Sequence, residues 1–173
     1  EPIDLVFLHV GVDDGAALVL DIADDDDAQL ASERLQVGPG LATGWEMPDD
    51  RTYLVHLRPG VIFHDGHELT SRDVVHTFSS FLDPDFVSAR KGAFALVESV
   101  TAVDRGTVRF RLRQPFASFP VNLVIQIVPD GAGPELRERP NGTGPYRFVR
   151  LTPDEEVVLE AFPGHFAGAP RNA

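Results

Sequence analysis

Cysteine is absent from the sequence of 173 residues. Its absence excludes disulfides, thiolate nucleophiles and zinc sites built on cysteine. Basic residues are scarce, because 15 Lys and Arg stand against 27 Asp and Glu and the formal net charge is −12 at pH 7. Proteins that bind the phosphate backbone of nucleic acids present clusters of Lys and Arg. The composition therefore argues against a nucleic-acid partner.

Long apolar runs are also missing, since none approaches the ~20 consecutive residues that a membrane-spanning helix needs. The apolar fraction of 43% is close to that of ordinary globular proteins. The length fits about one domain, and we expect residues 1–173 to form a single domain with a real core. The sequence begins at Glu1 and its only methionine is Met47, so its start tells nothing about targeting.

Four consecutive aspartates occupy residues 24–27 and raise the question of a calcium loop. An EF-hand loop needs acidic residues at alternating positions, a central glycine and a closing glutamate. The spacing here does not meet these requirements. A solvated acidic loop is the interpretation that we favour.

The periodicity of apolar residues predicts the elements of the fold. Residues 3–10 predict a strand, residues 15–23 a short helix and residues 38–44 a bend. Residues 53–58 alternate between two faces, which is typical of a half-buried strand. These segments suggest a strand, a loop and a helix, followed after a bend by a second strand.

Two further segments predict β-hairpins. The first spans residues 100–115 with a turn at Asp104, Arg105 and Gly106, and the second spans residues 146–162 with a turn at 152–154. We expect one substantial sheet formed by residues 53–58, 108–113 and 146–159. Residues 129–145, rich in Pro and Gly, are expected to form one long loop within the domain.

Three histidines and three acidic residues fall within FHDGHELTSRDVVHTF, residues 63–78. Such side chains can bind a metal ion. However, Gly66 separates His64 from His67 in what resembles a turn, so helical register cannot align the two rings. We favour a tight turn between a strand and a helix over a metal site or a catalytic site, and we expect no metal.

The helix after this turn is expected to begin at Thr70. Thr70 and Asp73 have the spacing of a capping box, in which each side chain accepts a hydrogen bond from an exposed backbone N–H. The expected end is near Asp83, because the residue before a proline avoids the α region. His76 falls outside the apolar stripe of this helix. The stripe consists of four residues that recur at helical spacing and are expected to be buried: Val74, Phe78, Phe81 and Leu82.

Several motifs occur in a fixed order along the chain. PGLATGWEM (39–47) is followed by LVHLRPGVIFHDGHELTSRDVVHTF (54–78), by the hairpin region 97–123 and by NGTGPYRFVRL (141–151). Together they resemble the family 5 extracellular solute-binding proteins, the dipeptide and oligopeptide receptors of bacterial ABC importers. The resemblance extends over residues 39–170. Residues 15–38 depart from the family pattern, and family members are several hundred residues long.

The resemblance implies a fold and a function. The fold is α/β with a mixed sheet and α+β character, as a partial first lobe of a type II periplasmic-binding-protein fold whose second lobe is absent. The function is capture of a small solute such as a peptide for an ABC permease, in the periplasm or outside the cell, with an N-terminal lipid anchor as a possible tether. The same fold also serves as the ligand-sensing module of transcription regulators, and what precedes Glu1 would separate the two functions.

Ligand contacts are expected at the loop after the first strand, where Gly11 lets the backbone approach a ligand closely. An equally good alternative is that this loop caps the following helix. Trp45 could be an aromatic ligand platform, but packing in the core or at a sheet edge is favoured, and Tyr146 is expected to be structural. The candidate ligand-binding residues are His9, Val10, Gly11, Val12 and Asp13.

No enzyme is expected. None of the serines stands in a G-x-S-x-G nucleophile elbow, and GTGPY (142–146) leads into a strand rather than a phosphate-binding helix N-terminus. No cofactor is expected either. Because the missing chain would complete the lobe, we expect an uncovered sheet edge or apolar face and a weak homodimer.

Overall fold

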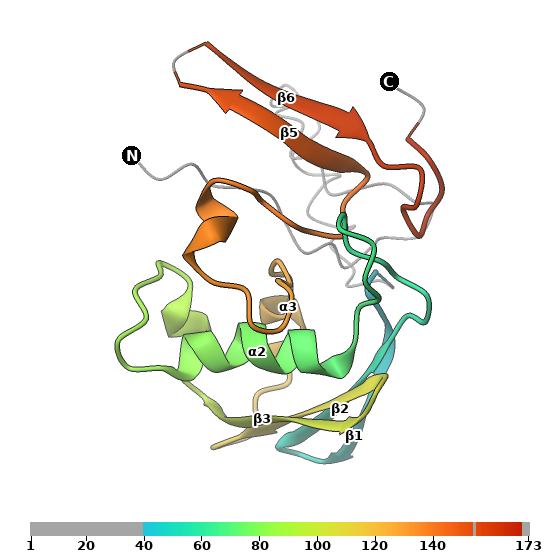
Figure 1. Cartoon of the computed structure of the whole chain (residues 1–173). Helices are drawn as coiled ribbons and strands as arrows, with labels where there is room; N and C mark the ends of the chain where they lie inside the picture. Colours follow the sequence, from blue (N-terminus) through green and yellow to red (C-terminus); the bar gives the residue numbers. More distant parts are fainter. Residues whose placement is uncertain (1–39, 154, 171–173) are drawn as a thin grey trace, which may run out of the picture.

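The computed structural model describes residues 40–153 and 155–170. Its main body contains an antiparallel sheet of four strands in the order β1-β2-β4-β3 (Figure 1). The strands are β1 (Ala42–Asp49), β2 (Thr52–Leu57), β3 (Val97–Asp104) and β4 (Thr107–Leu112).

The inner face of the sheet forms because apolar residues alternate on the two central strands. Tyr53 lies opposite Phe110, and Val55 lies opposite Val108. All four side chains are buried, as expected for cross-strand pairs on a core face. The predicted strand over residues 53–58 and the predicted hairpin with its turn at Gly106 are therefore confirmed.

Strand β1 was not expected from the sequence. A bend was predicted over residues 38–44, but the strand already begins at Ala42. β1 is an edge strand with five consecutive exposed residues and contains Pro48, so it lacks the alternation that marks a strand buried on one face. Its register with β2 is also irregular between Glu46 and Asp49.

Helix α2 (Ser71–Leu82) packs on the inner face of the sheet (Figure 1). Its N-cap is Thr70, which forms the predicted capping box with Asp73. Val74 and Phe78 are buried, and the Phe78 ring meets Phe110 edge-on at 4.8 Å between centroids. The helix ends at Leu82 and Asp83 is its C-cap, so the predicted start and end are confirmed. Of the predicted buried stripe, Val74 and Phe78 are buried, whereas Phe81 and Leu82 are only partly buried against the core.

Short elements complete the core. The Phe94 ring meets Phe78 at 5.3 Å and the Phe119 ring meets Phe110 at 5.5 Å. The expected loop over residues 129–145 contains one short 3₁₀ helix and is otherwise irregular. The short elements are η1 (Lys91–Phe94), α3 (Phe119–Asn122) and η2 (Pro134–Arg137).

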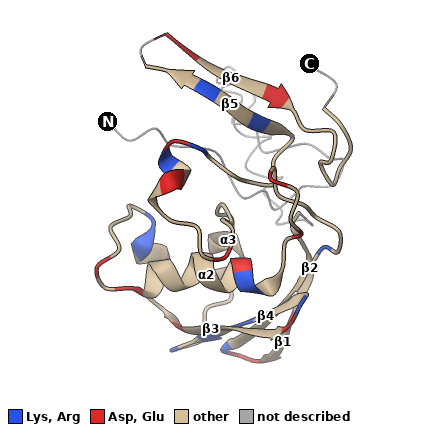
Figure 2. Ribbon diagram, viewed as in Figure 1, with Lys and Arg blue, Asp and Glu red and all other residues tan. Residues whose placement is uncertain are grey.

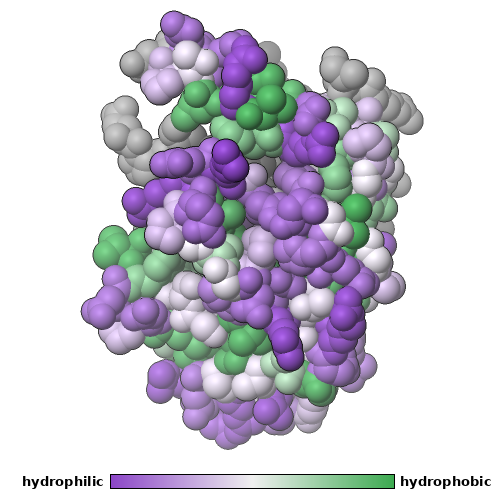
Figure 3. Space-filling model, in the orientation of Figure 1, coloured by the Kyte–Doolittle hydropathy of each residue, from purple (hydrophilic) through white to green (hydrophobic). Residues whose placement is uncertain are grey.

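The last hairpin forms a sheet of its own. Strands β5 (Tyr146–Thr152) and β6 (Glu156–Ala161) pair with each other in a two-stranded sheet, which projects from the body in Figure 1. The hairpin prediction is confirmed, but the expected single sheet that includes residues 146–159 is wrong. Figure 2 shows basic residues on β5 facing acidic residues on β6, and Figure 3 shows apolar side chains at the surface of the hairpin.

The remaining predicted elements lie outside the described residues. They are the strand at residues 3–10, the helix at 15–23 and the acidic loop at 24–27.

Candidate functional site

The five candidate ligand-binding residues, His9, Val10, Gly11, Val12 and Asp13, lie outside the described residues. Two aromatic residues discussed with them are placed. Trp45 lies on the edge strand β1 opposite Val55, with 40% of its surface exposed. Tyr146 begins β5.

The three histidines of residues 63–78 turn toward three different partners. The His64 ring lies 3.0 Å from the Gly144 carbonyl oxygen, and the His67 ring lies 2.7 Å from an Asp65 carboxylate oxygen. The His76 ring lies 3.2 Å from the Ala132 carbonyl oxygen. Within the described ranges, no group of three or more His, Asp or Glu side chains is arranged to hold a metal ion.

The turn between strand and helix has the geometry that its glycine requires. Gly66 has a φ of +94°, in the left-handed region that favours glycine. The Gly66 N–H donates to the Phe63 carbonyl at 2.9 Å, and the Phe63 N–H donates to the His67 carbonyl at 2.8 Å. Asp65 accepts the His67 N–H at 3.1 Å. The predicted tight turn is confirmed.

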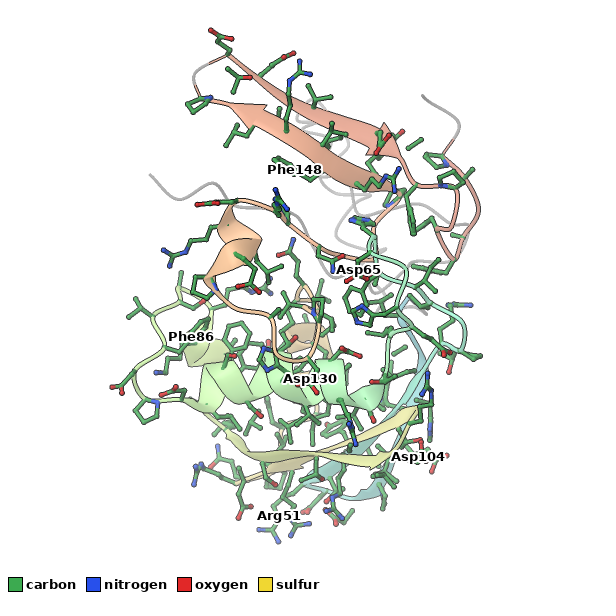
Figure 4. The ribbon with its side chains drawn as sticks, in the orientation of Figure 1. Arg51, Asp65, Phe86, Asp104, Asp130 and Phe148 are labelled. Atoms are coloured by element: carbon green, nitrogen blue, oxygen red, sulfur yellow. The ribbon has the colours of Figure 1, made fainter. Side chains whose placement is uncertain are left out.

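This turn also joins the body to the hairpin segment. The His64 N–H donates to the Gly142 carbonyl at 2.9 Å, and the Asn141 amide donates to Asp65 at 2.7 Å. The Phe162 ring, just after β6, meets the His64 ring edge-on at 5.0 Å. Figure 4 shows Asp65 between the body and the hairpin. We call these contacts the junction: residues 63–67, residues 141–145 and Phe162.

Electrostatics stabilise the ionised form of Asp65 in the junction. Burial opposes ionisation, but hydrogen bonds from the His67 backbone, the His67 ring and Asn141 outweigh it and lower the pKa of Asp65 below its ordinary value. Hydrogen bonds to a carboxylate favour its charged form in this way. The contacts of the junction therefore favour the charged form of Asp65.

A surface hollow of about 900 Å³ lies at the N-terminus of α2. The first turn of α2, the β3–β4 turn and the loop at Asp130 line it, and Figure 4 labels Asp104 on that turn and Asp130 on that loop. Charged side chains dominate its lining: His67, Glu68, Arg72, Asp73, Asp104, Arg105 and Asp130.

Most polar groups of this hollow already bond to protein atoms. Buried Asp73 accepts the Thr70 N–H at 2.7 Å and the Asp130 N–H at 2.8 Å. Glu68 pairs with Arg105 at 2.6 Å. The hydrogen bonds from Arg105 and Gly60, with the Arg105 charge, lower the pKa of Glu68. The polar side chains that line the hollow therefore mainly connect three segments of the fold, and few of them are left to bind a ligand.

Catalytic chemistry finds no support among the groups around this hollow. The buried Ser71 hydroxyl donates to the Asp104 backbone carbonyl, whereas a nucleophilic serine needs a general base at hydrogen-bond distance.

None of the helices within residues 40–153 and 155–170 has the length and hydropathy that a membrane crossing demands.

Sequence reasoning missed the long-range contacts of the turn. Asp130 bonds to Asp73, 57 positions earlier, and Gly144 bonds to His64, 80 positions earlier. Periodicity carries no information about such pairs. The only available signal was that the His-Asp-Gly and Gly-Thr-Gly-Pro-Tyr motifs occur in one chain.

Comparison with known proteins adds independent evidence. Residues 36–173 match the family described as bacterial extracellular solute-binding proteins, family 5 Middle. The di/tripeptide-binding protein 4 of Pseudomonas aeruginosa (strain UCBPP-PA14) is 35% identical over 78% of this chain and 31% of its own length. The glutathione-binding protein GsiB of Pectobacterium atrosepticum is 36% identical over 76% of this chain and 27% of its own length.

A solved structure shows the same fold. NikZ from Campylobacter jejuni, in complex with Ni(L-His), superposes with a TM-score of 0.73 at 27% identity, over 78% of this chain and 29% of NikZ. The chain thus spans less than a third of the length of these relatives. The described residues therefore correspond to part of a periplasmic-binding-protein fold.

Proposed function

This chain belongs to the bacterial extracellular solute-binding proteins of family 5, and on that premise we propose that it is part of the receptor of an ABC importer for short peptides. The family consists of binding proteins rather than enzymes. The observation that carries the proposal is the family match over residues 36–173, together with 35% identity to a di/tripeptide-binding protein.

The names of the relatives support short peptides as the solute class. The names of two of the relatives above refer to di- and tripeptides and to glutathione, and NikZ holds nickel with histidine. These ligands share amino-acid backbone or side-chain groups. A receptor for a peptide of two or three residues fits this set best, with a metal–amino-acid complex as the competing ligand.

The receptor encloses its ligand between two lobes, and residues 1–173 form part of the first lobe. Pockets that bind small ligands tightly bury 70–90% or more of the ligand surface, so half of such a clamp has little affinity. The receptor works outside the cytoplasmic membrane and delivers its solute to an ABC permease. A lipid-modified residue upstream of Glu1 would hold it at the membrane surface.

Isothermal titration of the complete protein tests this function. We expect saturable one-to-one binding of a mixture of di- and tripeptides, followed by a preference within a panel of single peptides. Glutathione and a nickel–histidine complex serve as matched alternatives. Binding of the nickel complex alone would replace the peptide assignment, and binding of none of these solutes would contradict the proposed solute class.

The sensor alternative finds no support in the fold or in the relatives reported above. All of these relatives are named for binding a solute or are solved with one.

A further inference from the structure

His64 binds the backbone of residues 142–144 through both nitrogens of its ring. Nε2 of the ring lies 3.0 Å from the Gly144 carbonyl oxygen, and Nδ1 lies 3.4 Å from the Gly142 nitrogen. A backbone carbonyl only accepts hydrogen bonds, and a backbone N–H only donates them. The ring therefore carries its proton on Nε2 and accepts through Nδ1, which is a neutral form of histidine.

The backbone of His64 adds a third bond to the same segment. The His64 N–H donates to the Gly142 carbonyl at 2.9 Å, so the two residues bond to each other in both directions. On the other side of the hairpin, the buried Phe162 ring meets the His64 ring edge-on at 5.0 Å. His64 thus contacts both the segment that enters the β5–β6 hairpin and a residue that follows it.

A protonated His64 is incompatible with this arrangement. An imidazolium carries a proton on each ring nitrogen and accepts no hydrogen bond. Its Nδ1–H would face the Gly142 N–H, so that two donors would point at each other. The Gly142 N–H would also lose the acceptor that it has in the junction.

The charged groups around the ring do not compensate for this conflict. On the same turn, the Asp65 carboxylate attracts a charged ring, but it already accepts from the His67 N–H, the His67 ring and Asn141. Residues 141–145 contain no titratable side chain. After β6, burial lowers the pKa of His165 and the charge of His64 lowers it further, against a hydrogen bond to the Gly168 carbonyl. Charges on both rings would therefore repel each other.

We propose that His64 makes the junction acid-sensitive: the neutral ring holds residues 142–144 against the body, and protonation of the ring releases them. The closed junction keeps His64 without its second proton, whereas the open junction lets it bind one, so acid favours opening. An unperturbed histidine titrates at about pH 6.5. The junction is therefore closed above that pH, and opening increases by up to about tenfold for each pH unit below it.

Amide hydrogen exchange of the 173-residue chain at about pH 7.5 and about pH 5.5 tests the proposal. Each rate is divided by that of the unfolded sequence at the same pH, which removes the intrinsic pH dependence of exchange and gives a protection factor. We expect the protection of the His64 and Gly142 amides to fall roughly tenfold at the lower pH. The protection of β2 and β4 should stay constant.

Three variants assign this pH step to one ring. His64→Asn retains a side-chain acceptor but cannot titrate, so protection at Gly142 should be the same at both pH values, whatever its level. His165→Asn and His67→Asn remove the neighbouring rings and should retain the step. Nitrogen NMR of the wild type gives an independent readout, because the His64 ring should carry its proton on Nε2 at the higher pH.

Four results would overturn the proposal. A pH step that persists in His64→Asn, or one that disappears in His165→Asn or His67→Asn, would assign the titration to another group. A His64 ring protonated on Nδ1 alone at the higher pH would contradict the hydrogen bond from Gly142. Unchanged protection in the wild type would show that a charged His64 leaves the junction closed.

Discussion

Replacing Asp73 by alanine is the sharpest test of how the strand, turn and helix are held together. Asp73 is only 3% exposed and accepts hydrogen bonds from the Thr70 N–H, the Thr70 hydroxyl and the Asp130 N–H, at 2.7, 2.9 and 2.8 Å. The variant removes half of the capping box and leaves the Asp130 N–H without its acceptor.

The expected loss can be worked out from these contacts. Losing the helix cap costs about 0.5–2 kcal/mol, and leaving the partly buried Asp130 N–H without its acceptor costs up to about 1–3 kcal/mol. Relief from burying the carboxylate offsets part of the sum. We expect Asp73→Ala to lower the free energy of unfolding by about 3 kcal/mol. For a chain of this size that lowers Tm by roughly 6–12 °C.

Urea unfolding followed by circular dichroism measures the change. Asp85→Ala is the matched control, because it removes the same charge from an exposed position and should stay within about 0.5 kcal/mol of wild type. Thr70→Val isolates the cap and should cost about 1 kcal/mol. A loss below about 1 kcal/mol for Asp73→Ala, or one no larger than that of Asp85→Ala, would refute the reasoning.

Three further predictions concern the turn, acid and the single lysine. Gly66→Val should lower the free energy of unfolding by about 1–3 kcal/mol, because the φ of Gly66 is +94°. Gly44→Val, in a strand with open space around it, should lower it less. Equal melting temperatures of the two variants would contradict the expected strain at the turn. The pKa of Asp65 is lowered in the folded chain, so Asp65 binds a proton more readily in the unfolded chain. The free energy of unfolding should therefore decrease as the pH falls below about 4. The same pH profile in Asp65→Asn as in the wild type would exclude this contribution. Lys91 donates to the carbonyls of Asp83, Pro84 and Phe86, so Lys91→Met should cost about 1 kcal/mol and speed hydrogen exchange in residues 83–91; unchanged exchange would show that those bonds do not hold the loop.

Local chemistry was readable from the sequence where one segment determines its own structure. The Thr70–Asp73 box defines the start of α2, and the alternation of Val108 and Phe110 defines β4. In both cases the residues that form the element also carry its signal. The Gly66 turn belongs to the same class, since the positive φ is local.

Assembly was less predictable, because alternation does not say which sheet a strand joins. Residues 146–159 alternate like a strand pair of the main sheet, yet they pair only with each other among the described residues. β1 was missed because an exposed edge strand with Pro48 has little pattern. The bond between His64 and Gly144 joins residues 80 positions apart, and no periodicity reports such a contact.

The charge pattern of the hairpin shows a third case. Arg147 and Glu160 are far apart in the sequence, and only the register places them opposite each other. A shift of one residue in one strand would turn its charges to the opposite face of the hairpin. The signal was present, and its meaning depended on pairing.

The most direct test of the solute-receptor account compares peptide binding by the 173-residue chain with that of the complete protein. Intrinsic tryptophan fluorescence, to which Trp45 is the only contributor in the 173-residue chain, and calorimetry can follow both titrations with the same di- and tripeptides. The account predicts saturable binding by the complete protein and none near micromolar by the chain, because the ligand is buried between two lobes. Saturable micromolar binding by the chain alone would contradict the two-lobed account, and failure of the complete protein to bind any peptide would contradict the peptide-receptor function.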